Sequence, residues 1–134
     1  MAMQKFQPGF RLSSLDIVIL IVGGVASACA TTVDRGLGVA IAFVILHFFL
    51  FCNVLRMSRP FELLWAGLFA GLAGMVITRN LLSWPVAYSI STGATVILGL
   101  IETHRPSYHG VGWRKLNPRL PEWWRSGGVR TASR

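Results

Sequence analysis

Four long apolar stretches constrain this chain more than any other feature of its sequence. An α-helix rises about 1.5 Å per residue, so roughly 20 apolar residues cross the hydrocarbon core of a bilayer. An open strand of this kind would leave its backbone groups unpaired in lipid. The sequence therefore predicts an all-α integral membrane protein with four transmembrane helices, at approximately residues 15–33, 37–55, 61–78 and 84–101.

The composition supports a membrane protein of one domain. Hydrophobic residues make up 53% of the 134 positions and charged residues only 13%, whereas a typical soluble domain is about 25% charged. The net charge of +8 would also suit a nucleic-acid-binding protein, but such proteins carry their charge on a soluble folded surface. Apolar residues collected in long runs exclude that class, and we expect no nucleic-acid partner.

The connections between the apolar stretches are short and contain turn residues. Asp34, Arg35 and Gly36 separate the first two stretches, and Pro60 suits the first turn of the third helix. Short loops make successive helices antiparallel neighbours. We therefore predict an antiparallel four-helix bundle at residues 15–101, preceded by an N-terminal segment at 1–14 and followed by an irregular tail at 102–134.

The first stretch has a second interpretation as part of a cleaved signal peptide. The small residues Ala28, Cys29 and Ala30 resemble a cleavage site. The stretch is longer than a normal signal core and contains Asp16, so we favour a transmembrane helix.

The distribution of basic residues predicts the orientation of the chain in the membrane. Only Arg35 and Arg79, among the 13 Lys and Arg residues, fall in the two loops on the far side from the termini. Cytoplasmic loops carry the excess of Lys and Arg. We therefore predict a multi-pass protein of a bacterial-type inner (cytoplasmic) membrane or its equivalent, with both termini in the cytoplasm.

Small residues recur at helical spacing in two of the stretches. Gly67, Gly71 and Gly74 share one face of the third helix, and Gly23 and Ser27 share a face of the first. Small residues allow helix backbones to approach closely in lipid. We expect these faces to pack within the bundle, or the face of the third helix to pack against a second copy or another subunit.

His47 is an ionisable residue near the midpoint of the second predicted span. Ionisable residues at this depth are costly and often functional. We considered a hydrogen bond to a Ser or Thr of the fourth helix, a proton relay, and axial ligation of a haem or chlorophyll-type pigment. A second histidine at this depth is missing from the sequence, so only single axial ligation is open to His47.

The acidic residues lie at the ends of the predicted helices. Asp16 follows two serines and is expected to stabilise a helix N-terminus, with an ion or proton site beside Arg56 or Arg59 as the alternative. We expect Glu62 to pair locally with Arg59. Glu102 is expected at the surface.

The tail combines prolines, aromatic residues and bases. Pro106, Pro118 and Pro121 exclude one long helix. Aromatic rings beside cations suit the headgroup region of an anionic membrane or the hot spots of a protein interface. We expect lipid or other membrane subunits to contact Tyr108, Trp113, Arg114, Lys115, Arg119, Trp123 and Trp124.

The sequence favours a non-catalytic role. It contains no cluster of His, Asp or Glu at one depth and no phosphate-binding or nucleophile motif. We expect an accessory or structural subunit of a larger membrane complex of the respiratory or photosynthetic kind. The alternative is a small homo-oligomeric transporter or channel whose path is lined by Ser89, Ser91, Thr92, Thr95 and His47.

Overall fold

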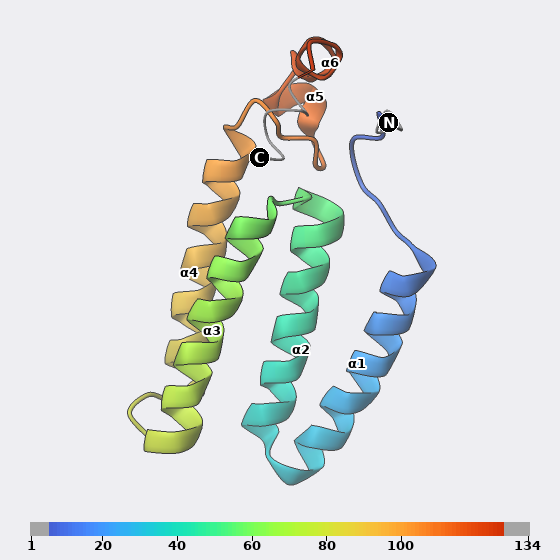
Figure 1. The fold of residues 1–134 in the computed structure, drawn as a ribbon. Helices are drawn as coiled ribbons and strands as arrows, with labels where there is room; N and C mark the ends of the chain where they lie inside the picture. The colour runs from blue at the N-terminus through green and yellow to red at the C-terminus, as the bar shows by residue number, and fades with distance from the viewer. Residues whose placement is uncertain (1–5, 128–134) are drawn as a thin grey trace.

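The computed structural model describes residues 6–127 and shows an all-helical chain (Figure 1). Over those residues it contains no strand. Lys5 and positions 128–134 of the predicted tail lie outside the described residues. The helices are α1 (Ser14–Val33), α2 (Arg35–Phe49), the π-helix η1 (Leu50–Leu55) that continues α2, α3 (Arg59–Arg79), α4 (Trp84–Thr103), α5 (Trp113–Leu116) and α6 (Leu120–Arg125).

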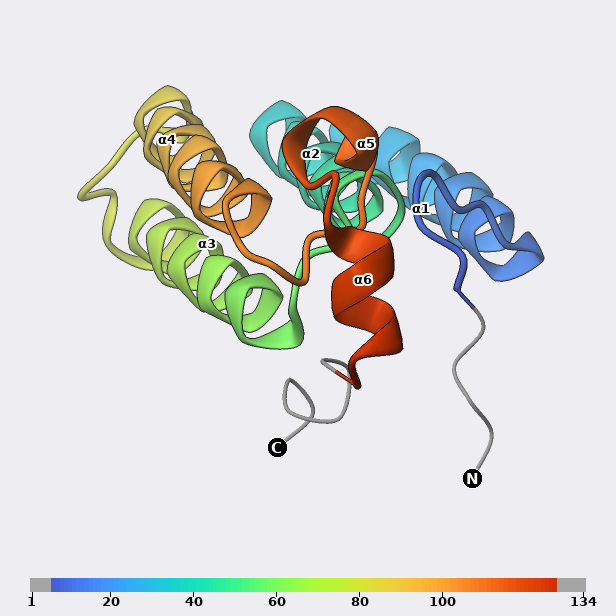
Figure 2. The same ribbon diagram turned by 90° about the horizontal axis from the view of Figure 1, so that it is seen from above.

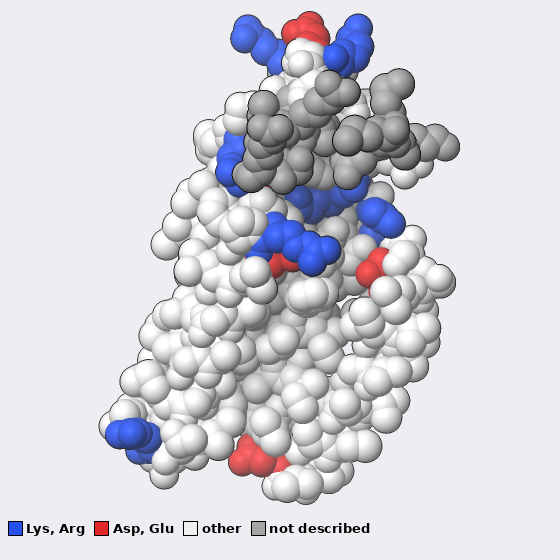
Figure 3. Space-filling view, viewed as in Figure 1, with Lys and Arg blue, Asp and Glu red and all other residues white. Residues whose placement is uncertain are grey.

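Four of these helical segments are long and apolar enough to cross a membrane. They contain 20, 21, 21 and 20 residues, with mean hydropathies of 2.0, 2.4, 1.7 and 1.4. Figure 3 shows the same division on the surface, where charged side chains gather towards the two ends and leave an uncharged band between them. The predicted number and positions of the apolar helices are confirmed.

Local side-chain bonds explain where the first two helices begin. Ser13 and Asp16 form a capping box, in which the Ser13 backbone N–H donates to the Asp16 carboxylate at 2.7 Å. Asp34 ends α1 and also begins α2, since its carboxylate accepts from the Leu37 N–H at 2.9 Å. A single residue therefore turns the chain between two membrane-length helices. The interpretation of Asp16 as a helix-starting acid agrees with this geometry.

The second apolar helix ends differently from the regular helix that the sequence predicts. Its last six residues, Leu50–Leu55, are wound as a π-helix. The helix stops where Arg56 adopts the left-handed conformation, with φ of 49°. A π-helix shifts backbone bonding from i→i+4 to i→i+5, and such segments are frequent at functional sites.

The helices α1 and α2 pack closely through small residues. A Cβ atom on Gly23 would collide with the side chain of Ile45, and one on Gly38 would lie 2.8 Å from the Ser27 carbonyl oxygen. The Ser27 hydroxyl donates to the Gly38 carbonyl at 2.7 Å. The structure thus places Gly23 and Ser27 at the contact between α1 and α2.

The long helices form an open row rather than surrounding a common centre. Figures 1 and 2 both place α1 at one side, next to α2, and the pair α3 and α4 at the other. Gly23 is the only buried residue of α1. The face in Figure 3 is hollowed between α1 and α3, with α2 behind. The core lies between α2 and the α3–α4 pair and includes Phe51, Trp65, Phe69 and Leu98.

Candidate functional site

An aromatic cluster surrounds His47 where α2 meets α3. The imidazole lies parallel to the Trp65 indole, with centroids 4.8 Å apart and an angle of 11° between the planes. Trp65 in turn stacks on Phe69, with centroids 5.5 Å apart. The Phe43 ring, one turn earlier in α2, has its centroid 4.1 Å from the centroid of the imidazole. These side chains fix the orientation of the histidine ring.

The backbone of α2 itself provides the hydrogen-bond partner of His47. The Nδ1 atom lies 2.8 Å from the Phe43 carbonyl oxygen. The expected bond to a hydroxyl of the fourth helix is therefore wrong, because a carbonyl one turn away is closer. A carbonyl can only accept, so Nδ1 is the donor of this hydrogen bond. Over residues 6–127, Nε2 has no hydrogen-bond partner.

The polar residues of α4 point to different faces of the helix. Ser91 and Thr95 are buried against α3, whereas Ser89 and Thr92 are exposed. The structure thus does not bring the expected transport path together on one face. Most hydroxyls also bond within their own helix: Ser89 donates to the Pro85 carbonyl at 2.8 Å and Thr95 to the Ser91 carbonyl at 2.9 Å.

Ser91 is the exception among these hydroxyl groups. Its carbonyl accepts from the Trp65 indole N–H at 3.1 Å. Its own hydroxyl oxygen is fully buried and has no hydrogen-bond partner among the described residues. A buried polar group without a partner is costly.

The glycine face of α3 lies outside the core. A Cβ atom on Gly67, Gly71 or Gly74 would meet no atom within 4 Å. The opposite face of α3 carries all its buried residues, which are Trp65, Phe69, Leu72 and Val76. The three glycines therefore do not pack within this chain, and the expectation of packing inside one bundle is wrong for α3. The large aromatic residues of α3 compete for the core and turn the glycines outward.

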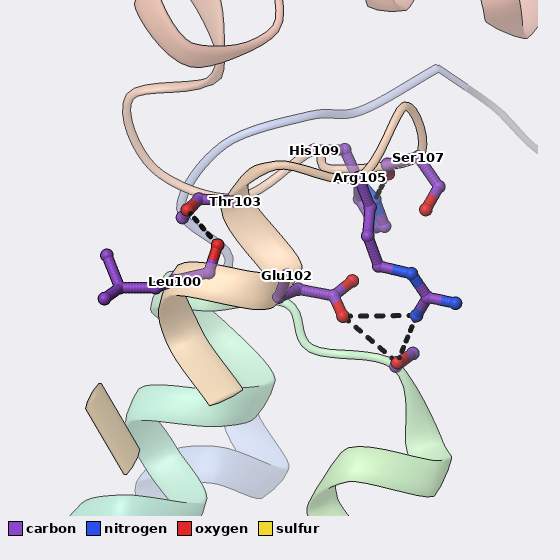
Figure 4. A network of polar contacts seen from close by, with 7 residues as sticks. Leu100, Glu102, Thr103, Arg105, Ser107 and His109 are labelled. Atoms are coloured by element: carbon purple, nitrogen blue, oxygen red, sulfur yellow. Dashed lines mark hydrogen bonds and ion pairs between the residues drawn. The ribbon is translucent and has the colours of Figure 1, made fainter. Parts of the chain in front are cut away.

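Glu102 is buried rather than exposed at the surface. Its side chain accepts from the Ser58 hydroxyl at 3.1 Å and pairs with Arg105 at 3.4 Å (Figure 4). Arg105 also lies over the Phe61 ring, 5.1 Å from its centroid. The expectation of a surface carboxylate is wrong, because Glu102 lies on the inward face of α4 and links its end to the start of α3.

Two other expected charge pairs are replaced by different contacts. Glu62 accepts from the Cys52 thiol at 3.4 Å, and within residues 6–127 it forms no ion pair with Arg59. Asp16 is bound to Ser13 and forms no ion pair with Arg56 or Arg59 in that range. The alternative of an ion site at Asp16 gains no support from these contacts.

The described segments before α1 and after α4 meet at the end of η1 and form what we call the terminal cap (residues 6–13 and 104–127; Figure 1). The Val111 N–H donates to the Val54 carbonyl at 2.8 Å, and the Arg11 N–H donates to the Asn53 carbonyl at 3.2 Å. The two segments also bind each other, since the Gly9 N–H donates to the His109 carbonyl at 2.7 Å. The carbonyls at the end of the π-helix thus anchor both segments.

The tail is more ordered than the irregular segment that the sequence predicts. It contains α5 and α6, and the side chain of Asn117 donates to the carbonyls of Pro106 and Tyr108 at 2.7 and 3.1 Å. Leu120 is fully buried. Tyr108 is 1% exposed and donates to the Val111 carbonyl at 2.7 Å. Tyr108 therefore belongs to the interior of the cap and cannot contact lipid or a partner.

The other aromatic and basic residues of the tail lie nearer its surface. Trp113 and Trp124 contact Phe6 edge-on, with centroids 5.9 and 5.4 Å away. Arg114 lies over Trp113, 5.7 Å from the ring centroid. Lys115 and Arg119 are exposed and Trp123 is half-buried.

Burial in the terminal cap and at the adjoining end of η1 shifts the pKa of three groups. It lowers the pKa of His109 below 6.5, against the opposing effect of a hydrogen bond to the Ser107 carbonyl. It also lowers the pKa of Arg56, with a smaller contribution from the charge of Arg11. It raises the pKa of Tyr108, and the charge of Glu102 acts in the same direction.

No family model, curated protein or solved structure matches this chain. The four apolar helices indicate a multi-pass membrane protein. Within residues 6–127, no group of three or more His, Cys, Asp or Glu side chains is placed to hold a metal ion.

Proposed function

We propose that this protein is a non-catalytic accessory or structural subunit of a larger membrane complex, of the respiratory or photosynthetic kind. In this proposal its four long helices cross a bacterial-type inner membrane antiparallel to one another. Both termini, and with them the terminal cap, lie in the cytoplasm, where the positive-inside rule places the excess of Lys and Arg. Neighbouring membrane subunits cover faces that this chain leaves open.

The outward glycine face of α3 is the observation that carries the proposal. Glycine inside a helix costs about 0.5–1 kcal/mol relative to alanine because it gains no packing and loses more entropy. No packing inside this chain offsets that free-energy cost at Gly67, Gly71 and Gly74, since a Cβ atom at each would meet no atom within 4 Å. A transmembrane helix of another subunit that packs closely against this face would explain their spacing.

The position of α1 is consistent with the same proposal. This helix contacts the rest of the chain through α2 and exposes large apolar residues such as Leu15, Ile21 and Val25. In lipid, exposure of this kind is favourable without a partner. It supports a role in assembly only together with the glycine face.

His47 would serve such a complex as a single axial ligand of a haem or chlorophyll-type pigment. A histidine ligand usually donates its other ring N–H to a carbonyl or carboxylate, which fixes the ring. The 2.8 Å contact between Nδ1 and the Phe43 carbonyl provides that arrangement and leaves Nε2 for a metal. An absorbance spectrum of the natively purified protein, compared with that of a His47→Ala variant, tests this role directly.

Native purification in mild detergent tests the proposed function. A particle much larger than the 14.7 kDa chain, with other polypeptides in fixed stoichiometry, would support the subunit. A particle that contains copies of this chain alone would contradict it.

The second candidate is a homo-oligomeric transporter or channel. Its support is the buried hydroxyl of Ser91, which has no partner among the described residues and would suit a hydrated path. Flux of a solute through liposomes that contain only this protein, reduced in a Ser91→Ala variant, would establish this candidate in place of the subunit.

A further inference from the structure

A pocket opens between the end of α4 and the short helices of the tail. Its volume is about 560 Å³, and its lining includes His104, Arg105, Arg119, Glu122 and Trp123. Two arginines, one glutamate and one tryptophan therefore line this pocket. This combination of charge and aromatic surface is typical of sites for phosphate-bearing ligands at a membrane interface.

The depth of the pocket corresponds to the headgroup region of a bilayer. The helix α4 has 20 residues, which span about 30 Å and therefore cross the hydrocarbon core. It ends at Thr103, and the pocket begins at the next residue, His104. A ligand in this pocket lies where the phosphates of one leaflet lie.

An exposed apolar ridge leads from the pocket down α4. Leu100 lies one turn below His104, whose Nδ1 is 2.7 Å from the Leu100 carbonyl oxygen. Ile97 follows one turn further on the same face. Leu100 and Ile97 are 57% and 60% exposed, so an acyl chain can lie along both.

The two arginines of the pocket have N–H donors that form no hydrogen bond with the described residues. Arg105 uses one guanidinium nitrogen for Glu102 and for the Ser58 hydroxyl, and a guanidinium carries five N–H donors. Arg119 is exposed, and its side chain has no hydrogen-bond partner in the described part of the chain. The site thus offers charged donors that are not satisfied by the protein alone.

We propose that this pocket binds the phosphate group of one anionic glycerophospholipid, with an acyl chain along Leu100 and Ile97. Arg119 and Arg105 donate to the phosphate. The Glu122 carboxylate, which also lines the pocket, repels the phosphate. This site is independent of the proposed role in a larger complex.

Titration of the delipidated protein with dioleoylphosphatidylglycerol, followed by native mass spectrometry, tests the proposal. We expect one lipid per chain to bind at least about tenfold more tightly than dioleoylphosphatidylcholine, because charge-assisted bonds to the phosphate are stronger when no choline cation competes. An Arg119→Gln variant should weaken phosphatidylglycerol binding about tenfold. Arg125→Gln is the matched control, since it removes the same charge from an exposed position of the tail outside the pocket lining, and it should change binding less than about twofold.

Glu122→Gln gives a second and opposite test. Removal of the carboxylate should tighten phosphatidylglycerol binding, because a repulsive charge is lost. Weaker binding in this variant, together with preference for phosphatidylethanolamine, would assign the pocket to a zwitterionic lipid and overturn the proposal. Equal losses of binding in Arg119→Gln and Arg125→Gln would show only a general attraction by the basic tail and would overturn the proposed site. Displacement of phosphatidylglycerol by millimolar inorganic phosphate would show a site that binds anions without recognising the lipid, and would also overturn the proposal.

Discussion

Trp65 stacks on His47, with ring centroids 4.8 Å apart and planes inclined by 11°. The same indole donates its N–H to the Ser91 carbonyl at 3.1 Å. One side chain of α3 thus contacts both α2 and α4. Trp65 is 3% exposed and lies in the buried cluster that links α2 with α3 and α4.

A Trp65→Phe variant should be less stable than the wild type by about 1 kcal/mol. Phenylalanine keeps the stacking on His47 but cannot donate to Ser91, and a hydrogen bond of this kind contributes about 0.5–1.5 kcal/mol. Unfolding in a mixed-micelle denaturant titration measures the change. Trp123→Phe is the control in the half-buried tail, and equal destabilisation by both variants would contradict the special position of Trp65.

A Gly110→Ala variant should release the terminal cap from η1. The new Cβ atom would lie 2.5 Å from the Leu55 carbonyl oxygen and 2.7 Å from the Val54 carbonyl oxygen, and neither backbone atom can move freely. Limited proteolysis of the tail should therefore become several-fold faster. Val111→Ala changes the neighbouring, exposed residue and should leave the rate near that of the wild type. Unchanged cleavage in both variants would contradict the proposed anchoring.

Acidification should loosen the terminal cap through His109. Burial lowers the pKa of this imidazole below 6.5, with the charge of Arg56 acting in the same direction and that of Glu102 opposing it. His109 therefore binds a proton more readily in the opened cap than in the closed cap. The contribution of neutral His109 to the stability of the closed cap is complete above pH 6.5, and it is lost as the pH falls through the lower pKa that His109 has in the closed state.

Hydrogen exchange measures this effect at the Gly9 amide, which donates to the His109 carbonyl at 2.7 Å. The protection factor, corrected for intrinsic exchange, should fall between about pH 7.5 and about pH 5.5. A His109→Asn variant should show a flat profile. The same pH dependence in wild type and variant would assign the effect to another group.

Hydropathy was sufficient to predict the membrane helices, because the length of each apolar stretch can be read directly from the sequence. The first stretch, predicted at 15–33, corresponds to Ser14–Val33 in the structure. The π-helix at Leu50–Leu55 could not be predicted in this way. Five of its six residues are apolar, so hydropathy does not distinguish the two helical periods. The carbonyls of Asn53 and Val54 accept from Arg11 and Val111, which lie far away in the chain.

The environment of single residues was less predictable than the helices that carry them. The spacing of Gly67, Gly71 and Gly74 correctly places them on one face but does not say whether that face is covered. Tyr108 has the proline-rich, basic surroundings of a surface residue, and only its contacts with the folded tail bury it. Glu102 is buried because its helix face meets Ser58, a relationship between residues far apart in sequence.

The glycine face of α3 carries the proposed assembly, and one pair of variants tests it most directly. Gly71 and Gly93 both lie on helix surfaces where a Cβ atom meets nothing within 4 Å, the first on α3 and the second on α4. We predict that Gly71→Leu reduces the particle purified from native membranes to this chain alone, because leucine prevents close helix approach. Gly93→Leu should leave the larger particle intact. A particle of unchanged mass and composition in Gly71→Leu would contradict the proposed docking of another subunit on α3.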